Sequence, residues 1–175
     1  MTANQLHLLD DDEGSTELPP LEVNVIRSNR RTKTAQARLL GHQIELRIPS
    51  GCSQDEEFEL VEHFTDKFER SRIANVTDIA ARAAGLADEY GLPQPKSIRW
   101  VSNQKSRWGS CTPADGTIRI SDRLASFPDW VLDYVIVHEL AHLVEPSHNR
   151  RFWDLVSIYP RTERARGFLI AKGWE

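Results

Sequence analysis

Residues 128–148, PDWVLDYVIVHELAHLVEPSH, form the most strongly patterned segment of the chain. Pro128 suits the first turn of a helix, where the missing N–H of proline costs nothing. Apolar residues then recur on one broad helical face as far as Ala141, whereas Pro146 cannot continue a helix. The pattern therefore predicts a largely buried helix that starts near Pro128 and ends close to Glu145.

Within this predicted helix, residues 138–142 spell HELAH, an HExxH motif. Residues i and i+4 lie one above the other on a helix, so the imidazoles of His138 and His142 can reach one tetrahedral metal at about 2.0–2.1 Å. Glu139 projects roughly 100° further around the helix, where it can reach a water on the metal without taking a coordination position. This is the arrangement of zinc hydrolases, so we predict bound Zn²⁺, a zinc-activated water and Glu139 as the general base.

A catalytic zinc has three protein ligands and one open position, so a third donor is needed. His148 follows His142 by six residues, just beyond the expected break at Pro146, and is the ligand that we favour. Glu163 is an alternative at roughly the distance where gluzincin families place a ligand, although RTERARG lacks their NExxSD-type pattern. Glu145 is a weaker alternative because it is too close along the chain to curl back.

The spacing of His148 is also that of the metzincin motif HExxHxxGxxH. Glu145 occupies the place of the turn glycine in that motif, and Met1 is the only methionine, so the supporting Met-turn is excluded. These two departures argue against a metzincin.

The remaining segments predict an α+β fold. Apolar and polar residues alternate over residues 23–48 on either side of Gly41, which is typical of a β-hairpin. Helices are predicted over residues 53–70, over residues 77–91 and after Ser147, and a strand, a turn and a strand are predicted between Ser97 and Leu124.

Composition and charge divide the chain into a leader and one domain. The chain has 175 residues, of which 39% are hydrophobic, enough for a single buried core. Residues 1–22 contain six acidic residues and no basic residue, so we predict a disordered acidic leader followed by a domain over residues 23–175. Beyond residue 22 there are 22 basic and 20 acidic residues, which gives nucleic-acid binding only weak support. Cys52 and Cys111 form no CxxC pair, so neither a disulfide framework nor a cysteine metal site is indicated.

No segment is typical of membrane insertion or secretion. The longest nearly apolar run, residues 130–141, is interrupted by Asp133 and Glu139. The first residues, MTANQLHLLDDDEG, lack the basic start and apolar stretch of a signal peptide. We therefore expect a cytoplasmic protein with no membrane partner, while the sequence does not indicate the oligomeric state.

Four ordered segments resemble a known family. They are RWGSC at residues 107–111, TIRIS at 117–121, DYVIVHELAHL at 133–143, and His148 followed by FW at 152–153. Together they resemble the YgjP-like metallopeptidases, which are related to the SprT and WLM families. The resemblance implies a minimal zincin in which a small mixed sheet packs on helices that include the HExxH helix. His138, His142 and His148 match the metal ligands of the family, and Glu139 matches its catalytic residue.

The resemblance favours a metallopeptidase that cleaves peptide bonds in a polypeptide substrate, and it leaves two alternatives. Members of the YgjP branch have been assigned nucleoside triphosphate hydrolysis. Arg and Lys residues of the first predicted strand, together with Lys105, Arg107, Arg150 and Arg151, could hold phosphates, although no Gly-rich phosphate loop is present. SprT relatives suggest a protease that acts on nucleic-acid-bound proteins.

Some roles in the site stay open at this stage. Arg107, Tyr159 and Arg161 are candidates for stabilising an oxyanion, and the sequence does not rank them. Gly109 is either a point of close backbone approach in the cleft or part of a buried strand. By analogy with zincins, we expect residues 117–121 to form a sheet edge that pairs with the substrate.

Overall fold

The computed structural model describes residues 18–104 and 106–173 of the chain. These residues fall into two compact units, which meet in the sequence between Ser53 and Gln54. Of the acidic leader predicted for residues 1–22, residues 1–17 lie outside the described residues. The domain predicted for residues 23–175 spans both units, and its existence as one domain stays a prediction.

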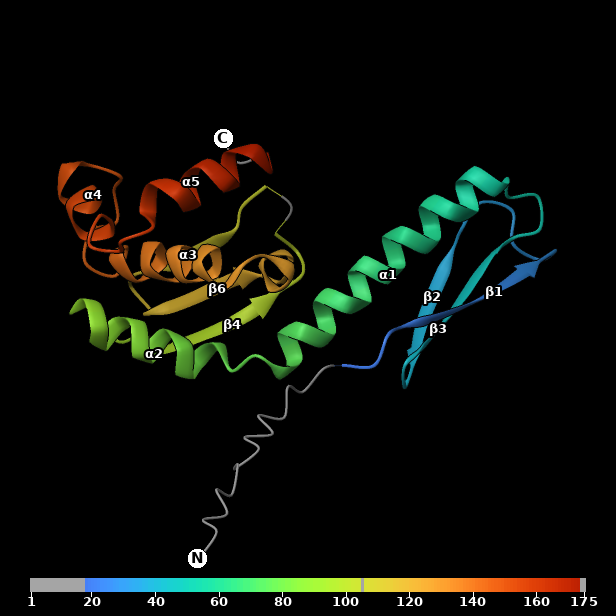
Figure 1. Ribbon diagram of the computed structural model, residues 1–175, viewed down its shortest axis with the longest axis horizontal. Coiled ribbons are helices and arrows are strands. Elements are labelled where there is room, and N and C mark those ends of the chain that lie inside the picture. Colours follow the sequence, from blue (N-terminus) through green and yellow to red (C-terminus); the bar gives the residue numbers. More distant parts are fainter. Residues whose placement is uncertain (1–17, 105, 174–175) are drawn as a thin grey trace, which may run out of the picture. The chain divides into compact units, whose positions relative to one another are not determined.

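The first unit contains a mixed sheet of three strands among its described residues (Figure 1). The strands are β1 (Glu22–Ser28), β2 (Gln36–Leu40) and β3 (Gln43–Pro49), in the order β1-β3-β2. Every second residue of β3 is fully buried, because successive side chains of a strand point to opposite faces: these are Ile44, Leu46 and Ile48.

The predicted hairpin over residues 23–48 was partly wrong. The turn at Gly41 joins β2 to β3, which are antiparallel, and Gly41 has the positive φ of 63° that favours glycine. β1 instead runs parallel to β3, with Val23 opposite Ile44. Alternating hydrophobicity indicates a strand, but it does not indicate which strand is the partner.

The second unit contains the helices. They are α1 (Gln54–Val76), α2 (Ile79–Tyr90), a 3-10 helix η1 (Asp122–Ser126), α3 (Asp129–Ala141), α4 (Arg150–Val156) and α5 (Thr162–Ala171). The limits of α2 follow from its capping residues. The Asp78 carboxylate accepts hydrogen bonds from the amides of Ala80 and Ala81, and Gly91 ends the helix in the left-handed conformation.

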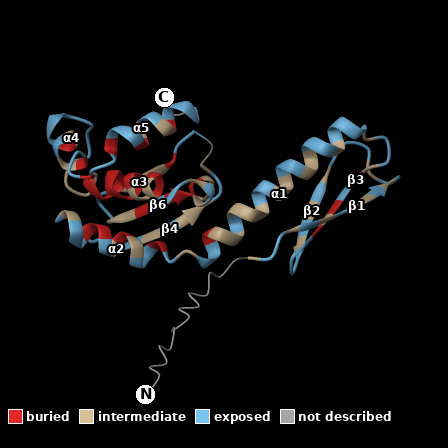
Figure 2. Ribbon diagram, in the orientation of Figure 1, coloured by how far each residue is buried: buried red, intermediate tan, exposed pale blue. Residues whose placement is uncertain are grey.

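A second mixed sheet supports these helices. Its strands are β4 (Ser97–Val101), β5 (Gly109–Thr112) and β6 (Thr117–Ser121), in the order β4-β6-β5. Helix α3 contacts β5 and β6, and it also contacts α2, α4 and α5. Figure 2 shows that the buried residues of this unit concentrate on α3. The predicted α+β class is therefore confirmed, with helices packed on a small mixed sheet.

Three expectations for this unit need correction. Residues 117–121 form the central strand β6, because β4 pairs with it on one side and β5 on the other, so the two edge strands of this sheet are β4 and β5. Helix α3 ends at Ala141 rather than close to Glu145, although the amide of Glu145 still donates to the Ala141 carbonyl at 2.9 Å. Two helices, α4 and α5, follow Ser147 where one was predicted.

None of the helices in the described residues is both long enough and apolar enough to span a lipid bilayer.

Candidate active site

Helix α3 is buried almost all round, and this burial positions the two histidines of the motif. Its residues from Val131 to Ala141 are buried except Asp133, because the sheet lies on one side and α4 and α5 contact the helix as well. A helix that is apolar on all faces is stable only in such surroundings. His138 and Glu139 are the polar exceptions, at 7% and 5% exposure. The burial of two polar side chains within an apolar helix indicates a functional site.

The structure brings His138, His142 and His148 together. His138 lies in the last turn of α3, His142 caps the helix, and His148 lies on the loop between α3 and α4. The Nε2 atom of His148 is 3.1 Å from Nε2 of His142 and 3.1 Å from Nε2 of His138. These three residues form a cluster that could hold a metal ion.

The donor set fits a metal. Two nitrogens that bind one tetrahedral metal at 2.0–2.1 Å lie about 3.3 Å apart, close to the observed separations. Nδ1 of His142 lies 3.1 Å from the Glu145 carbonyl oxygen, which can only accept a hydrogen bond, so Nδ1 carries the proton. Nε2 of a neutral His142 is then left with a lone pair that faces the cluster, as metal binding requires.

Burial also keeps the motif histidines neutral. Desolvation, together with the neighbouring His142 and His148, lowers the pKa of His138 to about 3. Burial lowers the pKa of His142 as well, although the hydrogen bond to Glu145 opposes this. Metals bind the neutral form of imidazole. Both rings are already in this form at neutral pH, so metal binding does not require them to release a proton.

Glu139 lies beside the histidines in a cavity of about 370 Å³. Burial raises the pKa of Glu139, the positive charge of Arg107 partly offsets this increase, and the resulting pKa is about 8. A carboxylate with a pKa near neutrality can both accept and return a proton at physiological pH. The cavity lining comes mainly from α3 and from β5 with the residues before it. Besides Glu139 and the three histidines of the cluster, it includes Arg107, Trp108, Gly109, Cys111 and Tyr134.

Gly109 makes room for Glu139. A Cβ atom on Gly109 would lie 2.8 Å from Cγ of Glu139 and 2.9 Å from Cδ, closer than real Cβ contacts. The glycine of RWGSC therefore allows β5 to approach the catalytic candidate itself. The sequence had left open whether this glycine served the cleft or a buried strand. Its contact with Glu139 gives a reason for glycine at this position: the Glu139 side chain occupies the space that a larger residue would need.

The structure also separates the other sequence candidates. Arg107 lines the cavity, whereas the hydroxyl of Tyr159 donates to the Trp130 carbonyl at 2.9 Å and neither Tyr159 nor Arg161 is part of the lining. Glu163 is exposed on α5 and pairs with Arg166 at 2.9 Å. An oxygen of the Glu145 side chain accepts from the amide of Ser147 at 3.3 Å.

Neither glutamate belongs to the histidine cluster. Cys111 lines the cavity, but burial and the charge of Glu139 raise its pKa to about 11, so its thiol is protonated at neutral pH and is a poor nucleophile.

Phe152 is a part of the site that sequence reasoning missed. It is fully buried on α4, and its ring stacks on that of His142 with centroids 4.4 Å apart and an angle of 26°. Its ring also meets His138 at 4.8 Å and His148 at 4.6 Å in edge contacts. The FW pair after His148 was the available signal, but its apolar character alone predicted only a packing residue.

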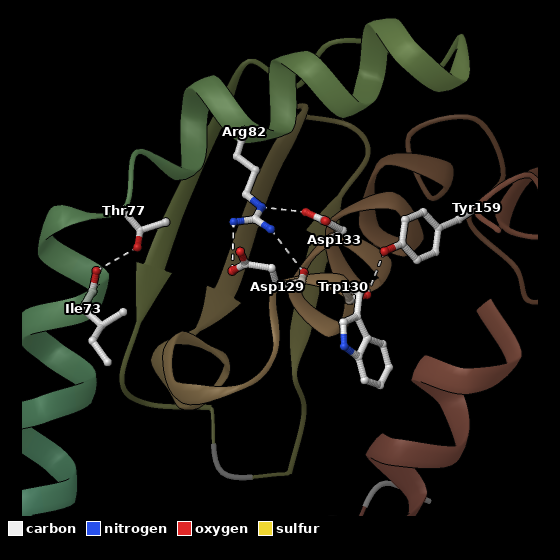
Figure 3. A network of polar contacts seen from close by, with 7 residues as sticks. All are labelled: Ile73, Thr77, Arg82, Asp129, Trp130, Asp133 and Tyr159. Carbon is white, nitrogen blue, oxygen red and sulfur yellow. Dashed lines mark hydrogen bonds and ion pairs between the residues drawn. The ribbon is translucent and has the colours of Figure 1, made fainter. Parts of the chain in front are cut away.

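Polar contacts fix the start of α3 (Figure 3). Arg82 of α2 donates from Nε to the Asp133 carboxylate at 2.6 Å and from Nη2 to the Asp129 carbonyl at 3.2 Å. The Tyr159 hydroxyl holds the carbonyl of Trp130, as described above. The helix that carries the motif is thus tied at its beginning to α2 and to the segment before α5.

Comparison with known proteins gives the family. A family model described as a YgjP-like metallopeptidase domain matches residues 22–170. The chain belongs to the YgjP-like metallopeptidase family. This membership supports a metal-dependent peptidase, and it agrees with the resemblance found in the sequence.

Other comparisons of the YgjP-like chain add little. No curated protein matched it. A crystal structure of the metallopeptidase zymogen of Pyrococcus abyssi abylysin is similar at 22% sequence identity with a TM-score of 0.48, over 53% of this chain and 92% of that chain.

Proposed function

We propose that this YgjP-like protein is a zinc-dependent peptidase of the HExxH type that cleaves a polypeptide substrate. In this proposal His138, His142 and His148 hold the metal, and Glu139 is the general base. One observation carries the proposal: Nε2 of His148 lies 3.1 Å from Nε2 of His138 and 3.1 Å from Nε2 of His142, in the cavity that also contains the buried carboxyl group of Glu139. Three imidazoles with an open side are the ligand set of catalytic zinc.

Bound zinc would act as a Lewis acid, lowering the pKa of a water and polarising the carbonyl that is attacked. The residues of the chain supply the rest of the chemistry. Glu139 takes a proton from the attacking water at its carboxylate and returns the proton to the leaving amine, and its side chain is almost fully buried beside the histidines. Arg107 supplies a positive charge at the cavity where negative charge develops on the substrate.

Strand β5 is the strand that we favour as the binding site for the peptide substrate. It is an edge strand, and its first residue, Gly109, contacts Glu139. Edge strands can pair with an extended peptide through backbone hydrogen bonds. We infer that the polypeptide binds along β5, which replaces the expectation for residues 117–121.

Phosphate hydrolysis has less support. Of the basic residues that could hold phosphates, Arg107 lines the cavity, whereas Arg150 and Arg151 are exposed at the start of α4 and are not part of the lining, and Lys105 lies outside the described residues. Among the described residues, the cavity lining therefore offers a nucleotide phosphate one arginine, Arg107.

The test compares Glu139→Gln with Glu145→Gln in assays on casein-type peptides and on nucleoside triphosphates. We expect Glu139→Gln to lose about 10²- to 10⁴-fold of peptidase activity, the usual contribution of general acid–base catalysis, while it still binds zinc. Glu145→Gln is the matched control, because Gln retains an oxygen for the Ser147 amide, and it should cleave like wild type. Full peptidase activity in Glu139→Gln would refute the proposed base. Turnover of triphosphates without peptide cleavage would replace the peptidase by a pyrophosphatase.

A further inference from the structure

His148 differs from the other two histidines in how its ring is held. His138 and His142 belong to α3, whose backbone and burial fix their positions. His148 lies on an exposed part of the loop between α3 and α4. Among the described residues, no hydrogen-bond acceptor meets its Nδ1, in contrast to His142 with the Glu145 carbonyl. An imidazole on a loop loses more freedom on binding a metal unless other contacts restrict it beforehand.

Trp153 provides such a contact. Its ring lies nearly parallel to the ring of His148, with centroids 5.7 Å apart and an angle of 27°. Trp153 is half-buried on α4, and the position of that helix is set directly after His148. The side chain of Asn149 accepts from the amide of Phe152 at 3.1 Å, and the amide of Trp153 donates to the Asn149 carbonyl at 3.1 Å.

Arg166 of α5 holds Trp153 in turn. Its guanidinium carbon lies over the Trp153 ring, 4.9 Å from the centroid, a cation–π contact. Its Nη1 atom binds the Glu163 carboxylate at 2.9 Å, one turn earlier on the same helix. The contacts therefore run from Glu163 to Arg166, to Trp153 and to His148, so that α5 restrains a loop residue through two stacked groups.

We propose that Trp153 is a positioning residue that orients His148 for metal binding, and that Arg166 fixes Trp153. The inference rests on the proposed function, because it assigns a role toward the metal that the three histidines would hold. The contribution of Arg166 is mechanical. Its positive charge near a cation site would by itself weaken metal binding, so a purely electrostatic role and the positioning role have opposite signs.

The chain offers a matched control on the same helix. Arg164 of α5 lies over the ring of Trp130, 4.6 Å from its centroid, and Trp130 is half-buried like Trp153. This pair makes the same type of contact but does not touch a histidine of the cluster. The carbonyl of Trp130 that accepts from Tyr159 belongs to the backbone and survives replacement of the side chain.

The experiment measures Zn²⁺ affinity by chelator competition, the thermal midpoint of the metal-free protein, and the visible spectrum after Co²⁺ loading. We expect Trp153→Leu to weaken Zn²⁺ binding about 10-fold or more, the usual scale for groups that orient a ligand, and to reduce the absorption typical of tetrahedral Co²⁺. Trp153→Phe should recover part of both, because a smaller ring still stacks. Trp130→Leu should lower the thermal midpoint similarly while its Zn²⁺ affinity stays within about 2-fold of wild type.

The outcomes separate this inference from the proposed function. Wild type without Zn²⁺ affinity would refute the proposed function itself. Wild-type affinity in folded Trp153→Leu, or an equal loss in Trp130→Leu, would refute only the role of Trp153. If Trp153→Leu does not fold, Trp153→Phe decides, and unchanged affinity and Co²⁺ spectrum would contradict the proposal. Arg166→Gln should bind Zn²⁺ more weakly than Arg164→Gln, and tighter binding would show that its charge dominates.

Discussion

The two sheets of the molecule have the same topology but differ in their chemistry. In each, the first and third strands are parallel, the second and third are antiparallel, and the third is central. The connections between first and second strands also have equal length, residues 29–35 and residues 102–108. Only the second sheet contributes to the cavity with Glu139. Strand order therefore does not make the site.

The difference lies in the second strand and in what packs on it. β5 begins with Gly109 and contacts α3, and Glu139 occupies the space that a side chain at Gly109 would need. β2 begins with Gln36, and no residue of its sheet belongs to the cavity lining. The two sheets share one topology, and the candidate active site forms only in the sheet where a glycine, Gly109, packs against the HExxH helix α3.

Among substitutions that test this difference between the two sheets, the largest effect is expected on the peptidase kcat when Gly109 is replaced. In Gly109→Ala the new methyl group must displace Glu139, and a displacement of about 1 Å in a catalytic group can cost about 10²-fold in rate. Peptidase kcat should fall on that scale while Zn²⁺ affinity stays close to that of wild type. Ala37→Gly is the reciprocal control in β2, where stability should fall slightly and kcat should not change. Wild-type kcat in Gly109→Ala would show that the close approach has no catalytic importance.

A smaller effect is expected from the ion pairs of the two units. Arg82→Met removes a contact of 2.6 Å between side chains that are only 25% and 21% exposed, and it leaves Asp133 of α3 without this partner. We expect a loss of roughly 1–3 kcal/mol in the free energy of unfolding. Arg47→Met removes the pair with Glu45 on the first sheet, where Arg47 is 50% exposed, and should cost at most about 1 kcal/mol. Urea denaturation measures the free energy of unfolding of both variants. Equal losses in the two would contradict the expected difference between these ion pairs.

The smallest difference between the two sheets is expected at the turn glycines of their hairpins. Gly41 and Gly116 have φ values of 63° and 64°, so replacement by alanine costs about 1–2 kcal/mol at either position. A Cβ atom on Gly116 would also lie 3.1 Å from Cγ of Lys96, whereas one on Gly41 meets nothing within 4 Å. Gly116→Ala should therefore have the lower thermal midpoint. A lower midpoint for Gly41→Ala would overturn this ranking.

The parts of the molecule that could be predicted from sequence are those with local patterns. The apolar pattern and the i, i+4 spacing of His138 and His142 predicted the buried helix, and the break at Pro146 together with the family resemblance favoured His148, which the structure brings to the same point. The metal and catalytic roles of these residues stay predictions.

What could not be predicted depends on contacts between distant segments. The parallel pairing of β1 with β3 leaves no mark in the alternation of either strand. Helix α5 was missed because its apolar residues are scattered among charges, as in TERARGFLIA. Phe152 and Trp153 read as packing residues, since their stacking on histidines arises only when α4 folds back against α3.

The central claim is that His138, His142 and His148 together hold one metal ion. The most direct test is the amount of zinc bound per chain, measured by mass spectrometry of the metal after dialysis, in wild type, His148→Ala and His63→Ala. His63 is exposed on α1 and outside the cluster, so it controls for loss of a surface histidine. We predict about one zinc ion per chain in wild type and His63→Ala and far less in His148→Ala. Wild-type zinc content in folded His148→Ala would contradict the claim.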